Sequence, residues 1–326
     1  MSSPRTYDAS SKKTGNARVT FPFKIMNIME EDPNVWFVFS DAARPDNSTG
    51  MILARFPDRC IDVGIAEQNM IGTSAGLALA GKKVFCMAFG PFLSLRATDM
   101  IHTDLAYNKL PVCVIGTHGG LTSGGGPTHY TLMDSSIMAS IPGMTMEVPA
   151  DANQGLRAID EFLKMDSPMY IRLARGQEPL VYEDDDYPFE IGKGIVVRDG
   201  TDVAIVADGI GVYNGLRACE ILESEGISAR LVDMHSVKPF DAELLCETAK
   251  KCGAVVTVED HGIHGGLGSV CAETLMESGI PCMFKRLGAP SDSFASLGYP
   301  EDLYRYYGFD AAGIASAARS LIGKKL

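Results

Sequence analysis

The chain lacks the segments that would place it in or across a membrane. No apolar run approaches the roughly 20 residues that a transmembrane helix needs. The first 15 residues are polar and contain no secretory apolar region. We therefore expect no membrane span, no export and no membrane partner.

Excess positive charge and paired cysteines are also missing. The chain has 29 Lys and Arg against 41 Asp and Glu, a net charge of −12, which argues against nucleic acid as a partner. No two cysteines form a CxxC pair, so a structural zinc site or a disulfide framework is not expected. We predict no metal site in this chain, and reduced, buried cysteines in a cytoplasmic protein. The cysteines are Cys60, Cys86, Cys113, Cys219, Cys246, Cys252, Cys271 and Cys282.

What is present is enough apolar sequence for two domains. Of the 326 residues, 46% are hydrophobic and 21% are charged. In residues 18–177, short apolar runs typical of buried strands alternate with helical patterns, which predicts a parallel sheet covered on both faces. The predicted strands are 35–39, 84–88, 112–115 and 169–173, and the predicted helices are 68–80, 96–107 and 152–165.

A second α/β unit follows in residues 195–326. We therefore predict an α/β fold of two consecutive domains, each a mainly parallel sheet with helices on both faces. Residues 1–17 are expected to be a flexible lead, and residues 178–194, which include an acidic run, a solvated linker. The predicted strands of the second unit are 203–207, 228–232, 254–258 and 282–285, and its helices are 212–225, 242–251 and 269–278.

Two motifs resemble nucleotide-binding loops only weakly. Residues 76–83 read GLALAGKK, where the Ser or Thr of a P-loop is replaced by Lys83 and the interior favours a helix. Residues 209–214 read GIGVYN, followed by Asp233 at the end of the next predicted strand. Asn214 replaces the third glycine of a dinucleotide fingerprint, so a dinucleotide-binding module remains only an alternative.

Glu67 and two phenylalanines are the first candidates for chemistry. Glu67, in the run GIAEQN, opens an apolar segment without other charges. We expect its carboxyl to be poorly solvated and able to hold or share a proton near neutral pH. Phe89 and Phe92, in the run FGPF, follow a predicted strand and could hold a flat heteroaromatic ring, although such residues are more often part of a core.

Two histidines and an arginine follow later strands. His118 and His129 bracket the glycine-rich run THGGLTSGGGPTH, and Arg175 ends the run IRLAR. Ligands in open α/β sheets gather at the carboxyl ends of strands, so these side chains are expected to converge with Glu67. They could bind phosphate or hydroxyl oxygens, and a histidine could also move protons. A lone histidine is more often structural. The prediction of a site therefore depends on the occurrence of both histidines together with Arg175 and Glu67.

These runs, with IPGMTMEVPAD and the later TVEDHGIHGGLG, closely resemble the pyrimidine-binding and C-terminal domains of transketolases. The resemblance implies a thiamine diphosphate enzyme that transfers a two-carbon ketol unit between sugar phosphates. It implies that Glu67 is catalytic and contacts N1′ of the aminopyrimidine of the cofactor, while Phe89, and Phe92 with it, flank that ring. FLSLR carries one residue more than the usual FxxRA run, which leaves the stacking position open.

On the substrate side, the resemblance makes His129 a catalytic residue that hydrogen-bonds the substrate near the reacting carbons. His118 and Arg175 would hold the substrate phosphate. The family usually has an acidic residue four positions before the second histidine, and here that position is Gly125. We therefore expect the donor sugar or its stereochemistry to differ from that of common transketolases.

The family's magnesium motif is absent. Thiamine diphosphate needs Mg²⁺, bound in this family by a GDG motif and a later Asn, and the sequence contains no GDG. We therefore expect an N-terminal transketolase subunit as partner, which carries GDG and supplies the diphosphate and Mg²⁺ site, in a two-fold heterotetramer. The alternatives are the beta subunit of a 2-oxo acid dehydrogenase decarboxylase component and a 1-deoxyxylulose-phosphate-synthase-like enzyme.

Overall fold

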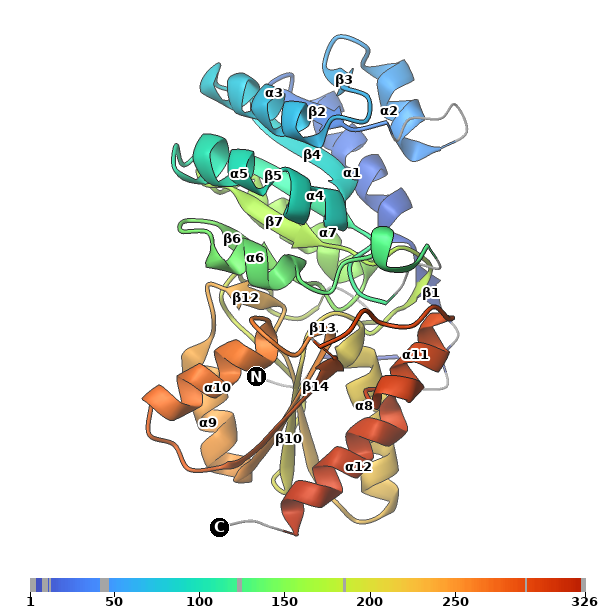
Figure 1. Cartoon of the computed structure of the whole chain (residues 1–326), viewed down its shortest axis with the longest axis vertical. Coiled ribbons are helices and arrows are strands. Elements are labelled where there is room, and N and C mark those ends of the chain that lie inside the picture. The colour runs from blue at the N-terminus through green and yellow to red at the C-terminus, as the bar shows by residue number, and fades with distance from the viewer. Residues whose placement is uncertain are drawn as a thin grey trace.

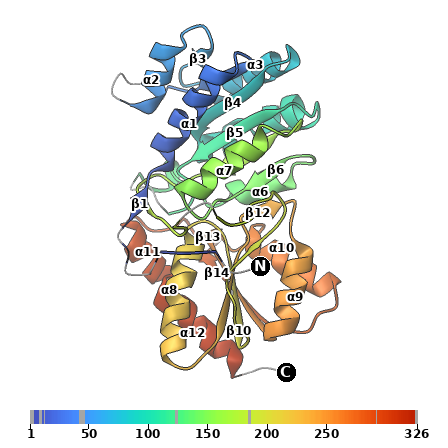
Figure 2. The same ribbon diagram turned by 180° about the vertical axis from the view of Figure 1, so that it is seen from behind.

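The computed structural model describes residues 4–7, 11, 13–41, 47–121, 125–183, 186–290 and 292–323. They form two α/β domains that follow each other along the long axis of the molecule, the first blue to lime and the second yellow to red (Figures 1 and 2). Within these ranges, no helix has both the length and the apolar character needed to cross a membrane. The predicted fold class is confirmed.

The first domain is built on a seven-stranded sheet with the order β12-β6-β7-β5-β4-β2-β3. All its pairings are parallel except that of β12 with β6. In β4, Phe85 and Met87 enter one hydrophobic core and Val84 and Cys86 the other, because successive side chains point to opposite faces. The strands are β2 (Val35–Phe39), β3 (Cys60–Asp62), β4 (Lys83–Phe89), β5 (Val112–Thr117), β6 (Thr145–Glu147), β7 (Met169–Arg172) and β12 (Ser236–Lys238).

Helices cover both faces of this sheet (Figures 1 and 2). One face packs against α1 (Ala17–Glu31), α2 (Ser48–Arg55) and α7 (Ala152–Phe162). The other packs against α3 (Glu67–Leu79), α4 (Gly90–Arg96), η1 (Ile101–Ala106, a π-helix) and α6 (Asp134–Ser140). The helix predicted over 96–107 is instead the end of α4, the short α5 (Thr98–Met100) and η1.

The second domain has a five-stranded sheet with the order β14-β13-β10-β11-β9, in which only β9 is antiparallel. Its strands are β9 (Ile195–Arg198), β10 (Val203–Ala207), β11 (Ala229–Asp233), β13 (Ala254–Gly262) and β14 (Met283–Ala289). One face packs against α8 (Ile210–Ser224) and α12 (Ala311–Ile322), the other against α9 (Ala242–Cys252) and α10 (Leu267–Glu277). Helix α11 (Pro300–Tyr307) precedes α12.

The lead is not free where the structure describes it. Strand β1 (Thr14–Gly15) pairs antiparallel with β8 (Glu178–Pro179), and Thr6 forms a further bridge with Tyr182. The prediction of a flexible lead over 1–17 is therefore wrong for these residues. Backbone hydrogen bonds to the linker hold them, and α1 already begins at Ala17.

The linker over 178–194 is also not simply solvated. Its apolar side chains Val181, Tyr182, Tyr187 and Phe189 are buried in the core that spans the two domains. Two residues of the acidic run, 184 and 185, lie outside the described ranges. The apolar residues on either side of the run hold the linker in place, because they bury apolar surface against both domains.

Candidate active site

Glu67 is buried at the carboxyl edge of the first sheet. It is the first residue of α3, and its side chain is only 3% exposed. Arg96 Nη1 lies 2.9 Å from Glu67 Oε2, and the Ser40 hydroxyl donates to Oε1 at 3.3 Å. The expected poor solvation is observed. The opposite charge on Arg96, from α4, was not predicted.

Phe89 and Phe92 lie next to this ion pair. Phe89 ends β4 and Phe92 falls in the first turn of α4, so the two rings stack with centroids 5.7 Å apart and planes 15° from parallel. The Arg96 guanidinium lies 4.8 Å from the centre of the Phe92 ring, a cation–π distance. Arg96 therefore connects the buried carboxylate to the aromatic pair.

His118 completes the inner part of the site. It follows β5, is buried, and its ring centroid lies 3.8 Å from that of Phe89. Its backbone has φ +65°, which is rare for a residue with a side chain. Thr117 Oγ1 lies 2.9 Å from His118 Nδ1, and the His118 carbonyl accepts a hydrogen bond from Thr131 N. Strained backbone held in this way is typical of functional sites.

His129 approaches the phenylalanines from the solvent side. It follows η2 (Gly126–Thr128) and is exposed, with its ring centroid 6.4 Å from Phe89 and 6.0 Å from Phe92. Residues 122–124 of the same loop lie outside the described ranges. The structure therefore brings both predicted histidines to the aromatic pair, one buried beneath it and one exposed beside it.

Positive charge gathers around His118. Burial, and then the charges of Arg18, Arg175 and His129, lower the pKa of His118 to about 3, so its imidazole is neutral at pH 7. Burial and the nearby Arg175 likewise lower the pKa of Arg18. Two guanidinium groups near a neutral imidazole suit an anion such as a phosphate. Arg18 comes from α1 and was missed, since the residues up to 17 were taken as lead and no motif surrounds it.

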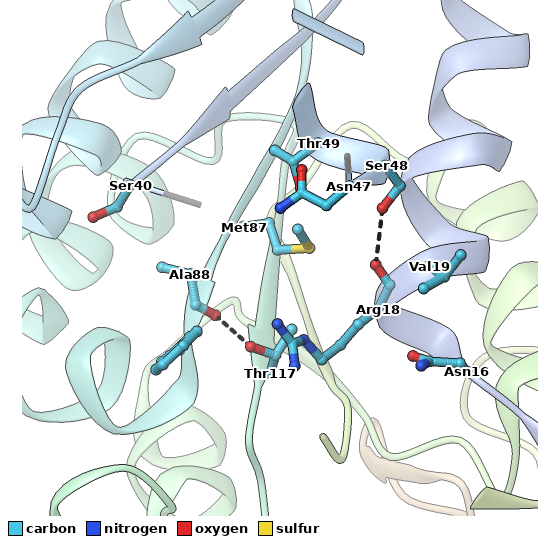
Figure 3. Close-up of a pocket in the computed structure, with 11 residues that line it drawn as sticks. Asn16, Arg18, Val19, Ser40, Asn47, Ser48, Thr49, Met87, Ala88 and Thr117 are labelled. Atoms are coloured by element: carbon cyan, nitrogen blue, oxygen red, sulfur yellow. Dashed lines mark hydrogen bonds between the residues drawn. The ribbon is translucent and has the colours of Figure 1, made fainter. Parts of the chain in front are cut away.

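A cavity of about 190 Å³ lies beside these groups, between α1, α2 and the ends of β4 and β5. Figure 3 shows the Arg18 side chain extending from α1 toward Thr117 at the end of β5. The cavity is lined by polar groups that can hydrogen-bond an oxygen-rich ligand, with Phe89 at one side. The polar lining residues are Asn16, Arg18, Ser40, Asn47, Ser48, Thr49 and Thr117.

The described residues suit one half of thiamine diphosphate and not the other. A buried carboxylate beside stacked rings provides a hydrogen-bonding group and an aromatic surface, which an aminopyrimidine requires. Across the described ranges, no cluster of three or more His, Cys, Asp or Glu side chains could hold a metal. The arrangement fits the pyrimidine end of the cofactor, and the described residues show no such cluster beside it for a magnesium ion.

The dinucleotide alternative is not supported by its own motif. The Asp233 carboxylate is buried and accepts hydrogen bonds from Tyr182 Oη and Gln154 Nε2, so it does not face a ligand. The turn before α8 is also covered, since Gly209 N donates to the carbonyl of Val148 from the first domain. The motif is an ordinary strand–helix turn packed at the domain boundary.

Two family models match the chain. Residues 23–179 match the model described as "Transketolase, pyrimidine binding domain". Residues 192–314 match "Transketolase, C-terminal domain". The two matches follow the two domains of the structure.

Known proteins resemble the chain over nearly its whole length. One subunit of the apulose-4-phosphate transketolase of Phocaeicola vulgatus is 35% identical over 94% of this chain and 97% of its own. A solved split-gene transketolase, described as an inactive beta4 tetramer, is 36% identical, with a TM-score of 0.85 over 95% of this chain and 99% of that one. The 1-deoxy-D-xylulose-5-phosphate synthase of Heliobacterium modesticaldum is 36% identical over 92% of this chain but only 46% of its own length.

Proposed function

Because the chain belongs to the transketolase family, we propose that it activates the thiamine diphosphate of a split transketolase whose other half is a separate partner chain. The enzyme is a transferase, and the reaction is the transfer of a two-carbon ketol unit between sugar phosphates. The observation that carries the proposal is a buried carboxylate and a stacked aromatic pair in a chain whose described residues offer no metal cluster.

On the cofactor side, thiamine diphosphate when bound supplies the nucleophilic carbon for breaking and making carbon–carbon bonds. Glu67 would share a proton with N1′ of the aminopyrimidine through its Oε atoms. Arg96 would hold the carboxylate in place from one side. Phe89 and Phe92 would orient the ring, and their stacked geometry supports this role.

On the substrate side, His129 would hydrogen-bond the sugar near the reacting carbons, since it is exposed at the edge of the aromatic pair. His118 and Arg175 would hold the phosphate, and we add Arg18 to this set because its charge acts on His118. A neutral His118 can donate or accept a hydrogen bond while the two arginines supply the charge. Gly125 leaves the position of the family's acidic residue without a side chain, so we propose a donor that does not need that contact.

The partner is proposed to be an N-terminal transketolase subunit with a GDG motif, which would bind the diphosphate and Mg²⁺. Two copies of each chain with two-fold symmetry would form the active assembly. End-to-end similarity to a single subunit of a known transketolase supports a separate partner. A cytoplasmic location is part of the proposal and is supported by the free cysteines.

Two alternatives remain within the fold. For the 1-deoxyxylulose-phosphate-synthase-like alternative, this chain matches 46% of the length of that relative. The beta subunit of a 2-oxo acid dehydrogenase decarboxylase component needs no phosphate clamp for its acyl donor. The charges around His118 therefore favour sugar phosphates.

Reconstitution tests the proposal. The purified chain with thiamine diphosphate and Mg²⁺ should show no ketol transfer, and addition of a GDG-bearing transketolase subunit should produce it with xylulose 5-phosphate or a related donor. Robust activity of this chain alone would contradict the split site. Decarboxylation of pyruvate by the mixed complex, without ketol transfer, would favour the alternatives.

A further inference from the structure

The loop that carries His129 lies against the second domain. Its stem is closed within the first domain, where Gly120 N donates to the Thr131 carbonyl at 2.9 Å. Beyond this stem, Leu121 at the start of the loop and Tyr130 at its end both hydrogen-bond to residues of the C-terminal domain. The two domains therefore meet at the loop itself.

Asp260, on β13, holds the start of the loop. Its carboxylate accepts the backbone N–H of Leu121 at 2.9 Å through Oδ1 and 3.1 Å through Oδ2. The Tyr304 hydroxyl donates to the same carboxylate at 3.1 Å, which fixes it from the side of α11. Arg172 Nη2 donates to the backbone carbonyls of Asp260 and Thr131, at 2.9 and 3.2 Å. Besides its contact with the loop, Asp260 is therefore held by Tyr304 at its carboxylate and by Arg172 at its backbone carbonyl.

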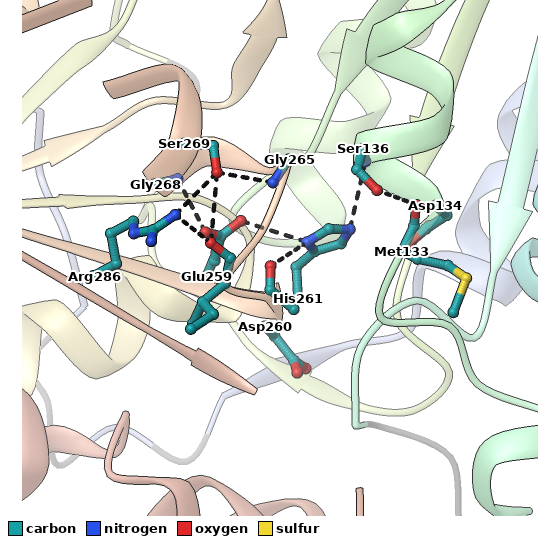
Figure 4. A network of polar contacts seen from close by, with 12 residues as sticks. Met133, Asp134, Ser136, Glu259, Asp260, His261, Gly265, Gly268, Ser269 and Arg286 are labelled. Carbon is teal, nitrogen blue, oxygen red and sulfur yellow. Dashed lines mark hydrogen bonds and ion pairs between the residues drawn. The ribbon is translucent and has the colours of Figure 1, made fainter. Parts of the chain in front are cut away.

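The loop backbone is shaped for this close approach. Gly120 has φ +76°, and a Cβ added there would lie 2.1 Å from Asp260 Oδ2. Only glycine fits both conditions, because the conformation is left-handed and the space is taken. Figure 4 shows the Asp260 carboxylate pointing away from the Glu259 and His261 side chains, which make a separate network with Gly268 and Ser136. The Asp260 carboxylate therefore contacts the loop and takes no part in that network.

The end of the loop is fastened by the segment 292–297. The buried Tyr130 donates its hydroxyl to the Ala295 carbonyl at 2.9 Å. Leu297 covers Gly126, where an added Cβ would lie 2.4 Å from Leu297 Cδ2. His129, between the residues held by these two contacts, remains exposed. Because Gly126 and Tyr130 are held, the backbone of His129 is held too, and this limits the positions that its ring can take.

We propose that Asp260 and Tyr130 are positioning residues through which the C-terminal domain holds His129 over the aromatic pair. The inference rests on the proposed function for the role of His129, and assigns the C-terminal domain a part in turnover. Asp260 acts on the loop start and Tyr130, through Ala295, on the loop end. Misplacement of a reacting group by about 1 Å costs on the order of 100-fold in rate, so small losses of anchoring are measurable.

A double-mutant cycle in the reconstituted complex tests the proposal. Asp260→Asn should lower kcat roughly 10- to 100-fold while the KM for the phosphorylated donor and the affinity for thiamine diphosphate stay unchanged. In a His129→Ala background the same substitution should have no further effect on kcat, because the residue it positions is gone. Asp302→Asn, which breaks only an exposed pair with Arg305, is the matched control. Equal losses in both backgrounds would overturn the proposal.

Hydrogen–deuterium exchange separates this inference from the proposed function. Asp260→Asn, but not Asp302→Asn, should raise exchange in residues 119–131 of the assembled protein, whether or not any ketol transfer is found. Unchanged exchange there would refute the holding role, while absent activity in wild type would refute only the proposed function. Should Asp260→Asn fail to fold, Tyr130→Phe decides by the same measurements, since it removes only the hydroxyl that reaches Ala295.

Discussion

Each domain buries a glutamate beside the carboxyl end of a parallel strand, and the two have different surroundings. Glu67 opens α3, with Arg96 at 2.9 Å and stacked phenylalanines beyond it. Glu259 lies in β13, where Gly268 N donates to Oε1. Burial raises the pKa of Glu259 to about 7, and the backbone N–H groups of Gly268 and Leu267 only partly offset it. Burial of an acid is therefore not enough to mark a site, and the neighbours of Glu67 are what distinguish it.

The buried histidines repeat this contrast. His118 lies against Phe89 among arginine charges, whereas His261 is fixed at the domain boundary by Ser136 N and the Gly262 carbonyl. His264, in the same glycine-rich turn as His261, is exposed. The contacts of His261 are therefore those of a structural residue. Of these two histidines, His118 therefore lies in the candidate site, whereas His261 holds structure at the domain boundary.

The largest expected effect is a difference in kcat between variants of the two buried glutamates. Glu67→Gln in the reconstituted complex should lower kcat at least about 100-fold, the range of a general acid–base group. Glu259→Gln should keep the wild-type kcat, because its carboxyl faces the helix turn and not the aromatic pair. Steady-state assays on both variants, normalised to folded protein, check this. Nearly intact turnover in Glu67→Gln would remove Glu67 from the mechanism.

A smaller effect is expected at the anion site. Arg18→Met should raise the KM for phosphorylated donors roughly 10- to 100-fold, since a charge-assisted hydrogen bond contributes about 1.5–3 kcal/mol. An unphosphorylated ketose should be used as well as by wild type, because it makes no such contact. Arg217→Met, at an exposed arginine of α8, serves as the control. An equal rise in KM for both donors would show that Arg18 does not bind the phosphate.

The smallest expected effect is on the pH dependence of the free energy of unfolding, through His261. Burial, and then the charge of Arg172, lower the pKa of His261 from 6.5 to about 4. The unfolded chain then binds one proton more than the folded chain between pH 6.5 and 4, so this histidine lowers the free energy of unfolding as the pH falls through that window. His261→Asn removes this dependence.

Urea unfolding at pH 7 and pH 5 measures the difference. The stability advantage of wild type over His261→Asn should shrink by about 2 kcal/mol between pH 7 and pH 5, at 1.36 kcal/mol per pKa unit. An equal stability advantage at both pH values would mean that the pKa of His261 is not lowered by folding, so that its imidazole is charged at pH 5 in the folded protein. The kcat should be unaffected at pH 7, in contrast to variants of His129.

The sequence predicted the parts of the fold that its pattern marks clearly. The interior strands β2 and β10 match the predicted ranges because both are continuous apolar runs bounded by polar residues. Helix α1 was missed because Pro22 interrupts a helical pattern. Close packing of α1 on α7 outweighs the cost of that proline. Phe21 lies so near Gly155 of α7 that a Cβ added at Gly155 would be 2.5 Å from Phe21 Cζ. Strands of three residues, such as β6, are too short to show a period.

The candidate site was predictable where a motif fixes a residue at a strand end. Glu67, Phe89, Phe92, His118 and His129 were placed together on that basis, and the contacts among them agree. Arg96 and Arg18 were not, because their long side chains reach across elements that no motif connects. Asp260 was missed for the same reason, since its contact with Leu121 spans 139 positions of sequence.

Strand β12 has a consequence for the independence of the two domains. It belongs to the segment that follows β11, yet it forms the outer edge of the first sheet by pairing with β6. Lys238 also donates to the carbonyls of Ala139 and Ile141. A pyrimidine domain cut off at the linker would expose β6 as an uncapped edge, and such edges recruit other chains. We therefore expect that a pyrimidine domain expressed without β12 would self-associate unless another segment covers β6.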